Sequence, residues 1–119
     1  MDGIIFFVIP AEPSFTETVI RLIASIPCGR VATYGQIAAC AGNHRASRQV
    51  ARILHSCSDK RKLPWHRVVG GRGSISLLAG GGFEEQKALL EGEGIEVAER
   101  GLIDLREYLW NPASEPDRS

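Results

Sequence analysis

The chain has 119 residues, of which 44% are hydrophobic and 24% charged, and its 14 Lys and Arg balance its 14 Asp and Glu. This length suits one domain, and the composition excludes a collagen-like, coiled-coil or wholly disordered chain. The first apolar run, Ile4 to Ile9, is too short for a membrane span, and Asp2 stands where a signal peptide would be basic. We therefore expect a cytoplasmic protein with no membrane partner.

The balanced net charge hides an uneven distribution. Between Cys28 and Arg72, nine Lys and Arg stand against one Asp, a formal charge of +8, and the rest of the chain carries −8. A basic segment gathered on one face would attract a polyanion through the release of counterions. The same bases could instead pair with the acidic segments, and the composition leaves both interpretations open.

The three cysteines, Cys28, Cys40 and Cys57, form no C-x-x-C pair. This spacing favours neither a disulfide framework nor a thiolate zinc cage. His44 and His55 add no metal-ligand spacing, so we expect no metal and no cofactor.

The first predicted helix begins after Ser14, with Glu17 as its capping-box partner, and ends before Pro27. Its apolar residues at helical spacing are Phe15, Val19, Leu22, Ile23 and Ile26. A short extended piece at residues 31–32 follows.

Thr33 and Gln36 form a second capping box, which predicts a helix from Tyr34 to about Ala41. After a turn at residues 42–43, a third helix is expected from His44 or Arg45 to about Cys57. Its predicted buried side holds Val50, Ile53, Leu54 and Cys57. Its opposite side holds Arg45, Arg48, Arg52 and His55. Two short helices joined by a tight turn, the second with a basic face, are typical of a helix-turn-helix.

After Pro64 the pattern changes. Arg67–Val69 and Ile75–Leu78 flank a glycine-rich turn, which predicts a β-hairpin wing. A further helix is expected over Phe83–Glu91, and Ile95–Val97 is at most a short strand. The fold class predicted is α/β, mainly helical, with an extension at 1–13, a winged helix-turn-helix domain at 14–110 and a flexible tail at 111–119.

Three stretches occur in order: Ile26–Ala38 (IPCGRVATYGQIA), Ala46–Val50 (ASRQV) and Pro64–Val69 (PWHRVV). Together with Leu89–Gly94 they resemble the DNA-binding domain of the O6-alkylguanine-DNA alkyltransferases. Several spaced motifs in the right order are far more specific than one. The resemblance implies a winged helix-turn-helix alkyltransferase DNA-binding domain.

In the repair-competent members of that family, the motif Pro-x-His-Arg-Val carries a cysteine at x, where this chain has Trp65. This change resembles the alkyltransferase-like proteins, which bind alkylated DNA without repairing it. Removing an alkyl group requires a thiolate, and an indole has no accessible nucleophilic lone pair. The resemblance therefore implies no catalytic residue, and the face of Trp65 suits stacking on a base. The alternative is that Trp65 is only a core aromatic.

The resemblance also implies further site residues. Tyr34 corresponds to the tyrosine that presses on the target phosphate, and Arg48 to the arginine finger that fills the gap left by a flipped base. His66, Arg67 and Glu93 correspond to residues that brace the site, here in a structural role. The predicted DNA contacts are Tyr34, Arg45, Arg48 and Arg52. The predicted lesion pocket comprises Tyr34, Trp65, His66, Arg67 and Val68. The alternatives are a half-buried Tyr34 and a solvated Arg48.

The function expected is non-enzymatic recognition of O6-alkylguanine in double-stranded DNA. A monomer would bind the minor groove, flip the base and present it to nucleotide excision repair proteins. One alternative is an active alkyltransferase that uses a displaced thiol such as Cys57, which an alkyl adduct would reveal. Another is a winged-helix transcription regulator, whose affinity would follow sequence and not damage. The stretch Leu77–Gly82 aligns poorly with the pocket loop of the family and is expected to form a lid.

Overall fold

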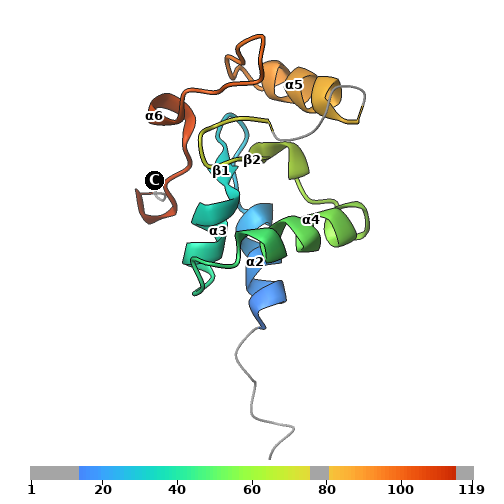
Figure 1. The fold of residues 1–119 in the computed structure, drawn as a ribbon, viewed down its shortest axis with the longest axis vertical. Coiled ribbons are helices and arrows are strands. Elements are labelled where there is room, and N and C mark those ends of the chain that lie inside the picture. Colours follow the sequence, from blue (N-terminus) through green and yellow to red (C-terminus); the bar gives the residue numbers. More distant parts are fainter. Residues whose placement is uncertain (1–13, 76–80, 115–119) are drawn as a thin grey trace, which may run out of the picture.

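The computed structural model describes residues 14–75 and 81–114 (Figure 1). The elements in chain order are α2 (Phe15–Ala24), β1 (Ala32–Thr33), α3 (Tyr34–Cys40), α4 (Ser47–Arg61), η1 (Trp65–Arg67), β2 (Val68–Val69), α5 (Phe83–Gly92), α6 (Leu105–Tyr108) and η2 (Pro112–Ser114). Helices α2, α3 and α4 lie on one side of the two strands, and α5 and α6 on the other. The mainly helical α/β class is confirmed. Within these two ranges, no helix has the length and hydropathy of a bilayer span.

Both predicted N-caps begin helices where the sequence places them, and of the two predicted capping boxes the one at Thr33 and Gln36 is complete. The Ser14 hydroxyl accepts a hydrogen bond from the Glu17 amide at 3.1 Å and begins α2. The Thr33 hydroxyl accepts from the Gln36 amide at 3.0 Å, and the Gln36 side chain accepts from the Thr33 amide at 3.3 Å. Because the Thr33 and Gln36 amides, which have no partner within the helix, both find an acceptor, α3 starts directly at Tyr34 without a linker after β1.

The helix-turn-helix is present, but α4 is displaced along the chain relative to its prediction. It begins at Ser47 and not at residue 44 or 45, and it continues to Arg61. The Asn43 side chain accepts from the Arg45 amide at 3.1 Å, which holds residues 43–46 in a turn. Arg45 therefore lies in the turn before α4.

The sheet is a parallel pair of two-residue strands that separates two hydrophobic cores. Ala32 of β1 pairs with Val68 of β2, and Thr33 pairs with Val69. Since side chains alternate along a strand, Val68 packs into one core and Val69 into the other. The first core joins α2, α3 and α4 with Trp110 from the C-terminal segment. The second comprises Val31, Val69, Ile75, Leu90, Ile95, Val97 and Ile103.

The predicted β-hairpin wing is wrong over the described residues. Val68 and Val69 pair with β1, and Ser74 forms an antiparallel bridge with Leu102 instead of pairing back. The turn itself is present, since the Gly70 amide donates to the Ser74 carbonyl at 2.8 Å. Turn residues signal a chain reversal, but they do not specify which remote segment supplies the partner. Residues 76–78 of the predicted hairpin lie outside the described ranges. The possible strand at residues 95–97 is irregular.

The turn generates a stability prediction at Gly73. Its φ is 82°, and a Cβ there would collide with the Ile103 carbonyl oxygen. We expect Gly73→Ala to lower the free energy of unfolding by at least about 2 kcal/mol, because a left-handed conformation and a backbone clash add together. Urea denaturation followed by circular dichroism measures this.

Gly71 in the same turn is the matched control. A Cβ at Gly71 meets no atom within 4 Å. Gly71→Ala should leave stability within about 1 kcal/mol of the wild type. If the two substitutions changed stability equally, the fold would accept a Cβ at residue 73 as easily as at residue 71, and the predicted clash with Ile103 would be wrong.

Candidate nucleic-acid interface

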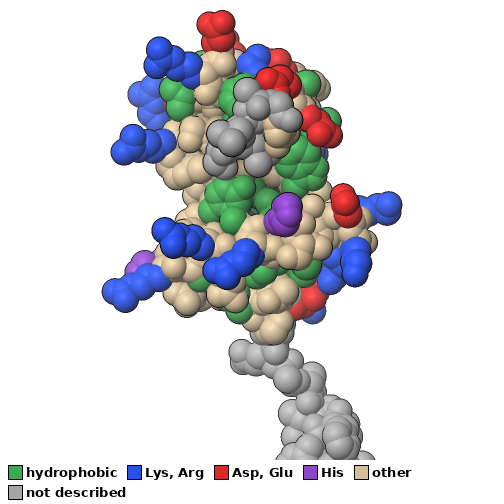
Figure 2. Space-filling view, turned by 45° about the vertical axis from the view of Figure 1, so that its right-hand side comes forward, with side chains coloured by type: hydrophobic (Ala, Val, Ile, Leu, Met, Phe, Trp, Pro, Cys, Tyr) green, Lys and Arg blue, Asp and Glu red, His purple; other side chains and the backbone are tan. Residues whose placement is uncertain are grey.

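A cavity of about 640 Å³ opens between α4 and the start of α5. Leu54, His55 and Asp59 of α4 form one wall. Figure 2 shows hydrophobic side chains in a hollow at the waist of the molecule, with a histidine at its edge and basic side chains below it. This volume lies within the range of about 300–1,000 Å³ that is usual for pockets that bind small organic groups. A flipped nucleobase is of that class.

Two aromatic side chains line the cavity, each from the first residue of a helix. Tyr34 begins α3, where the Thr33 capping box fixes it, and it is half-buried. Trp65 begins η1, and its ring meets the His66 ring edge-on, with centroids 6.0 Å apart at 85°. Trp65 also packs against the first core. Trp65 is therefore both a core aromatic and part of the cavity wall, and the two interpretations of this residue do not exclude each other.

Gln86 holds η1 against α5. Its side chain is 3% exposed, and its Nε2 donates to the His66 carbonyl at 2.9 Å and to the Val68 carbonyl at 3.1 Å. It also lines the cavity. Gln86 is not among the site residues predicted from the sequence, although a signal was present. Gln86 stands three residues after Phe83 and four before Leu90, so a polar side chain interrupts an apolar stripe.

The Glu93 carboxylate joins three segments behind the cavity. It accepts from His66 Nε2 at 2.7 Å, from Arg67 Nη2 at 2.7 Å and from the Gly29 amide at 3.1 Å. Arg67 also donates to the Ile26 carbonyl at 2.8 Å. The side chains of His66, Arg67 and Glu93 are 13%, 18% and 13% exposed, so water screens the cluster weakly.

The cluster determines the protonation of Glu93. Burial alone would raise the pKa of this carboxyl. Hydrogen bonds from Arg67, His66 and the Gly29 amide outweigh burial and lower the pKa from 4.5 to about 2. Glu93 is therefore a carboxylate at neutral pH and stabilises the positive charge of Arg67.

Only part of the predicted lesion pocket lines this cavity. Tyr34 and Trp65 do, whereas His66, Arg67 and Val68 are not in its described lining. His66 and Arg67 turn toward Glu93, and Val68 is 1% exposed in the first core. The reason is the 3-10 turn of η1, which sends successive side chains in different directions.

The predicted DNA contacts lie on an accessible surface beside the cavity. Arg48 and Arg52 are exposed on α4, and Arg45 is exposed in the preceding turn. None of these three arginines forms an ion pair with a described residue. Two other bases of the same segment do pair with acidic residues, Arg61 with Glu17 and Arg67 with Glu93. The interpretation that the basic segment pairs with the acidic segments therefore holds for part of it and not for these three arginines.

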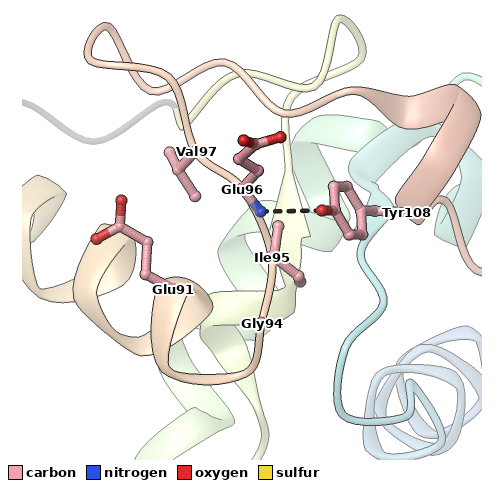
Figure 3. A pocket seen from close by; sticks show the side chains of 6 residues that line it. All are labelled: Glu91, Gly94, Ile95, Glu96, Val97 and Tyr108. Carbon is pink, nitrogen blue, oxygen red and sulfur yellow. Dashed lines mark hydrogen bonds between the residues drawn. The ribbon is translucent and has the colours of Figure 1, made fainter.

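A second depression, of about 400 Å³, lies on the far side of the Glu93 segment (Figure 3). The Glu96 amide donates to the Tyr108 hydroxyl at 3.2 Å, which fastens α6 to residues 94–97. Its ionisable lining is Glu91, Glu96 and Tyr108. Such an acidic surface suits neither a phosphate backbone nor an anionic ligand.

The three cysteines lie away from the cavity. Cys28 and Cys40 are exposed, and Cys57 packs beside the first core. None of them belongs to the cavity lining among the described residues. Those residues also contain no group of three His, Cys, Asp or Glu side chains that could hold a metal ion.

Residues 14–95 match the family model of the 6-O-methylguanine DNA methyltransferase DNA-binding domain. The chain belongs to this family. The match covers the helix-turn-helix, the cavity and the Glu93 cluster, and it confirms the resemblance read from the motifs.

Relatives within the family extend this finding. The chain is 45% identical over 100 residues to the DNA base-flipping protein of Escherichia coli, which covers 84% of this chain and 77% of the relative. It is 37% identical over 103 residues to alkyltransferase-like protein 1 of Schizosaccharomyces pombe, covering 82% and 95% respectively.

Solved structures agree with the fold. The S. pombe Atl1 structure in complex with damaged DNA containing O6-carboxymethylguanine matches with a TM-score of 0.75 and 34% identity, covering 87% of this chain and all of that chain. The Mycobacterium tuberculosis OGT structure in complex with DNA matches with a TM-score of 0.54 and 29% identity, covering 71% and 51%.

The lowered pKa of Glu93 predicts how stability depends on pH. A carboxyl whose folded pKa lies below its ordinary value stabilises the fold above 4.5, and this stabilisation is lost as the pH falls from 4.5 toward 2. The shift corresponds to about 3 kcal/mol. Glu93→Gln should lose about that much stability at neutral pH and show a flatter decline in acid, as measured by urea denaturation at a series of pH values.

Glu91 provides the control on the same helix. Its carboxylate is exposed and contacts Lys87 at 2.8 Å. Glu91→Gln should cost about 0.5 kcal/mol or less and leave the acid dependence of the wild type. A Glu93→Gln protein with the same acid profile as the wild type would contradict the stabilising role of the cluster.

Proposed function

We propose that this protein recognises O6-alkylguanine in double-stranded DNA without removing the alkyl group. The basic face of α4 binds the minor groove of the duplex, Arg48 occupies the gap left by the flipped nucleotide, and the extruded base enters the cavity between Tyr34 and Trp65. The observation that carries this proposal is the position of an aromatic cavity of about 640 Å³ beside exposed arginines on α4. A flipped base needs an aromatic or apolar pocket next to a backbone-binding surface.

The named relatives support this proposal. One is called a DNA base-flipping protein, and another has been solved on damaged DNA that contains an O6-alkylguanine. Binding to damaged DNA is a property of those proteins, and we extend it to this chain on the shared family and fold.

The proposal excludes alkyl transfer. Trp65 stands where we expect the acceptor cysteine of the repair-competent members, and an indole cannot act as the nucleophile. A displaced thiol would have to reach the base, and the three cysteines lie outside the described cavity lining. A protein that binds a lesion without repairing it needs another system, and we propose presentation to nucleotide excision repair in the cytoplasm. An alkyl adduct on any cysteine after incubation with methylated DNA would contradict the proposal that the protein transfers no alkyl group.

Arg48→Ala tests the basic face of α4. We expect weaker binding to damaged and undamaged DNA alike, because a side chain that fills the gap stabilises the flipped state whichever base is extruded. The dependence of affinity on salt concentration should change little, because that dependence follows the number of phosphates neutralised, and Arg48 is proposed to fill a gap in the base stack instead. Fluorescence anisotropy with labelled duplexes at several salt concentrations measures both quantities.

Arg100→Ala is the matched control, because Arg100 is an exposed arginine in the loop between Val97 and Ile103. It changes the net charge equally. If Arg48→Ala weakens binding no more than Arg100→Ala, Arg48 is a solvated side chain and not a DNA contact.

Trp65→Ala tests the cavity. Stacking on a base is worth about 1–3 kcal/mol, so this variant should lose affinity of that order on O6-methylguanine duplexes and far less on undamaged ones. Trp65→Phe keeps an aromatic face and should retain most of the preference for the lesion. Competition binding with matched duplexes measures the ratio.

Removal of a half-buried tryptophan also destabilises the fold, so thermal unfolding accompanies each variant. A folded Trp65→Ala protein that keeps the full lesion preference would show that Trp65 only packs. Affinity that follows sequence and ignores damage in the wild type would favour a transcription regulator and contradict the proposed function.

A further inference from the structure

The cavity that we assign to the flipped base is lined by more acidic than basic side chains. Asp59 from α4 and Glu85 from α5 line it, and both side chains are exposed to solvent. His55 is the remaining ionisable side chain of the described lining apart from Tyr34. No Lys or Arg belongs to that described lining. Figure 2 shows acidic side chains to the right of the hydrophobic hollow and above it, and basic side chains below it.

The neighbouring sequence adds no cation. Residues 76–80, between the described ranges, read Ser-Leu-Leu-Ala-Gly and contain no ionisable side chain. Within the described chain, neither Asp59 nor Glu85 forms an ion pair. Two carboxylates therefore face the cavity without a cation to neutralise them.

We infer that this cavity selects its base by charge: it accepts O6-alkylguanines with a neutral alkyl group and disfavours those whose alkyl group is an anion. The inference rests on the proposed function and adds a lesion class to it. Asp59 and Glu85 are the residues that determine this specificity. The flipped base itself is neutral, so the charge of the alkyl group decides the electrostatic energy of the complex.

Coulomb repulsion gives the direction and the size of the effect. An anionic alkyl group inside the cavity would share its walls with both carboxylates, and like charges in one partly hydrated site repel. It also loses water without gaining a cationic partner from the described lining. Together these effects should weaken binding about tenfold relative to a neutral group of equal size. S. pombe Atl1, solved with O6-carboxymethylguanine, shares 34% identity with this chain, which leaves room for a different charge in its pocket.

The test compares four duplexes of one sequence that differ at a single guanine. They carry guanine, O6-methylguanine, O6-carboxymethylguanine and O6-carbamoylmethylguanine, the last being the neutral amide of the same size as the acid. Competition anisotropy at constant salt gives the four affinities for the wild-type protein. We expect O6-methylguanine and the amide to bind more tightly than guanine, and the acid about tenfold more weakly than the amide.

The variants identify the residues. Asp59→Asn with Glu85→Gln should raise the affinity for the acid to within about threefold of the amide. Since any lost negative charge favours DNA binding in general, Glu99→Gln is the control: Glu99 is exposed and lies outside the described cavity lining. It should shift all four affinities equally and leave the ratio of acid to amide unchanged. Thermal unfolding checks that each variant is folded.

The outcomes separate the inference from the proposed function. If O6-methylguanine and the amide bind no better than guanine, the proposed function fails, and the inference fails with it. If they bind better but the acid equals the amide, only the inference is overturned. If the acid is weaker but the double variant keeps the wild-type ratio, the repulsion comes from elsewhere, and the assignment to Asp59 and Glu85 is overturned.

Discussion

The Glu93 carboxylate is the interaction on which the site depends. It accepts hydrogen bonds from the loop before β1, through Gly29, and from both His66 and Arg67 of η1. Two segments that are remote in the sequence, the loop before β1 and η1, are thus tied to the end of α5. A charged group left without its partners in such a place costs several kcal/mol, so the cluster favours a single arrangement of η1. Trp65 lies at the start of η1, and the cluster thereby fixes the wall of the cavity without contacting what enters it.

The two-residue sheet transmits this constraint to the helices. Since Val68 and Val69 of β2 pack into different cores, a shift of β2 by one residue would exchange them and bury neither core correctly. Thr33 ends β1 and also caps α3, so the position of the sheet determines that of Tyr34. Gln86 fixes the other end, because its amide satisfies the carbonyls of η1 and β2. Both aromatic walls are therefore held by hydrogen bonds between a polar side chain and the backbone, so they depend on Thr33, Gln36 and Gln86.

The sequence predicted local features well and remote pairings poorly. The N-caps at Ser14 and Thr33 bond to amides three residues away, so they could be read directly, and the basic face of α4 follows from helical spacing. The partner of β2 could not be read, because a two-residue strand has too few side chains to mark its neighbour. The motif containing Trp65 predicted the tryptophan in the cavity but not the directions of His66 and Arg67, which the turn of η1 determines. Asp59 and Glu85 were missed because α4 and α5 meet only in the folded chain.

The residues of the Glu93 cluster, which hold η1 in place, are not the residues that line the cavity from α4 and α5. A member of this family can therefore keep lesion recognition without keeping catalysis. In a thiol-bearing active site, a histidine beside a carboxylate would serve proton transfer. In this chain the pair of His66 and Glu93 holds η1 in place, since Glu93 is ionised and accepts hydrogen bonds from Arg67 as well as from His66. If the nucleophile is absent, as we propose, this cluster is still needed to hold η1 in place. The side chains that enter the cavity from α4 and α5 take no part in this cluster, and they are free to vary with the lesion that the protein must bind.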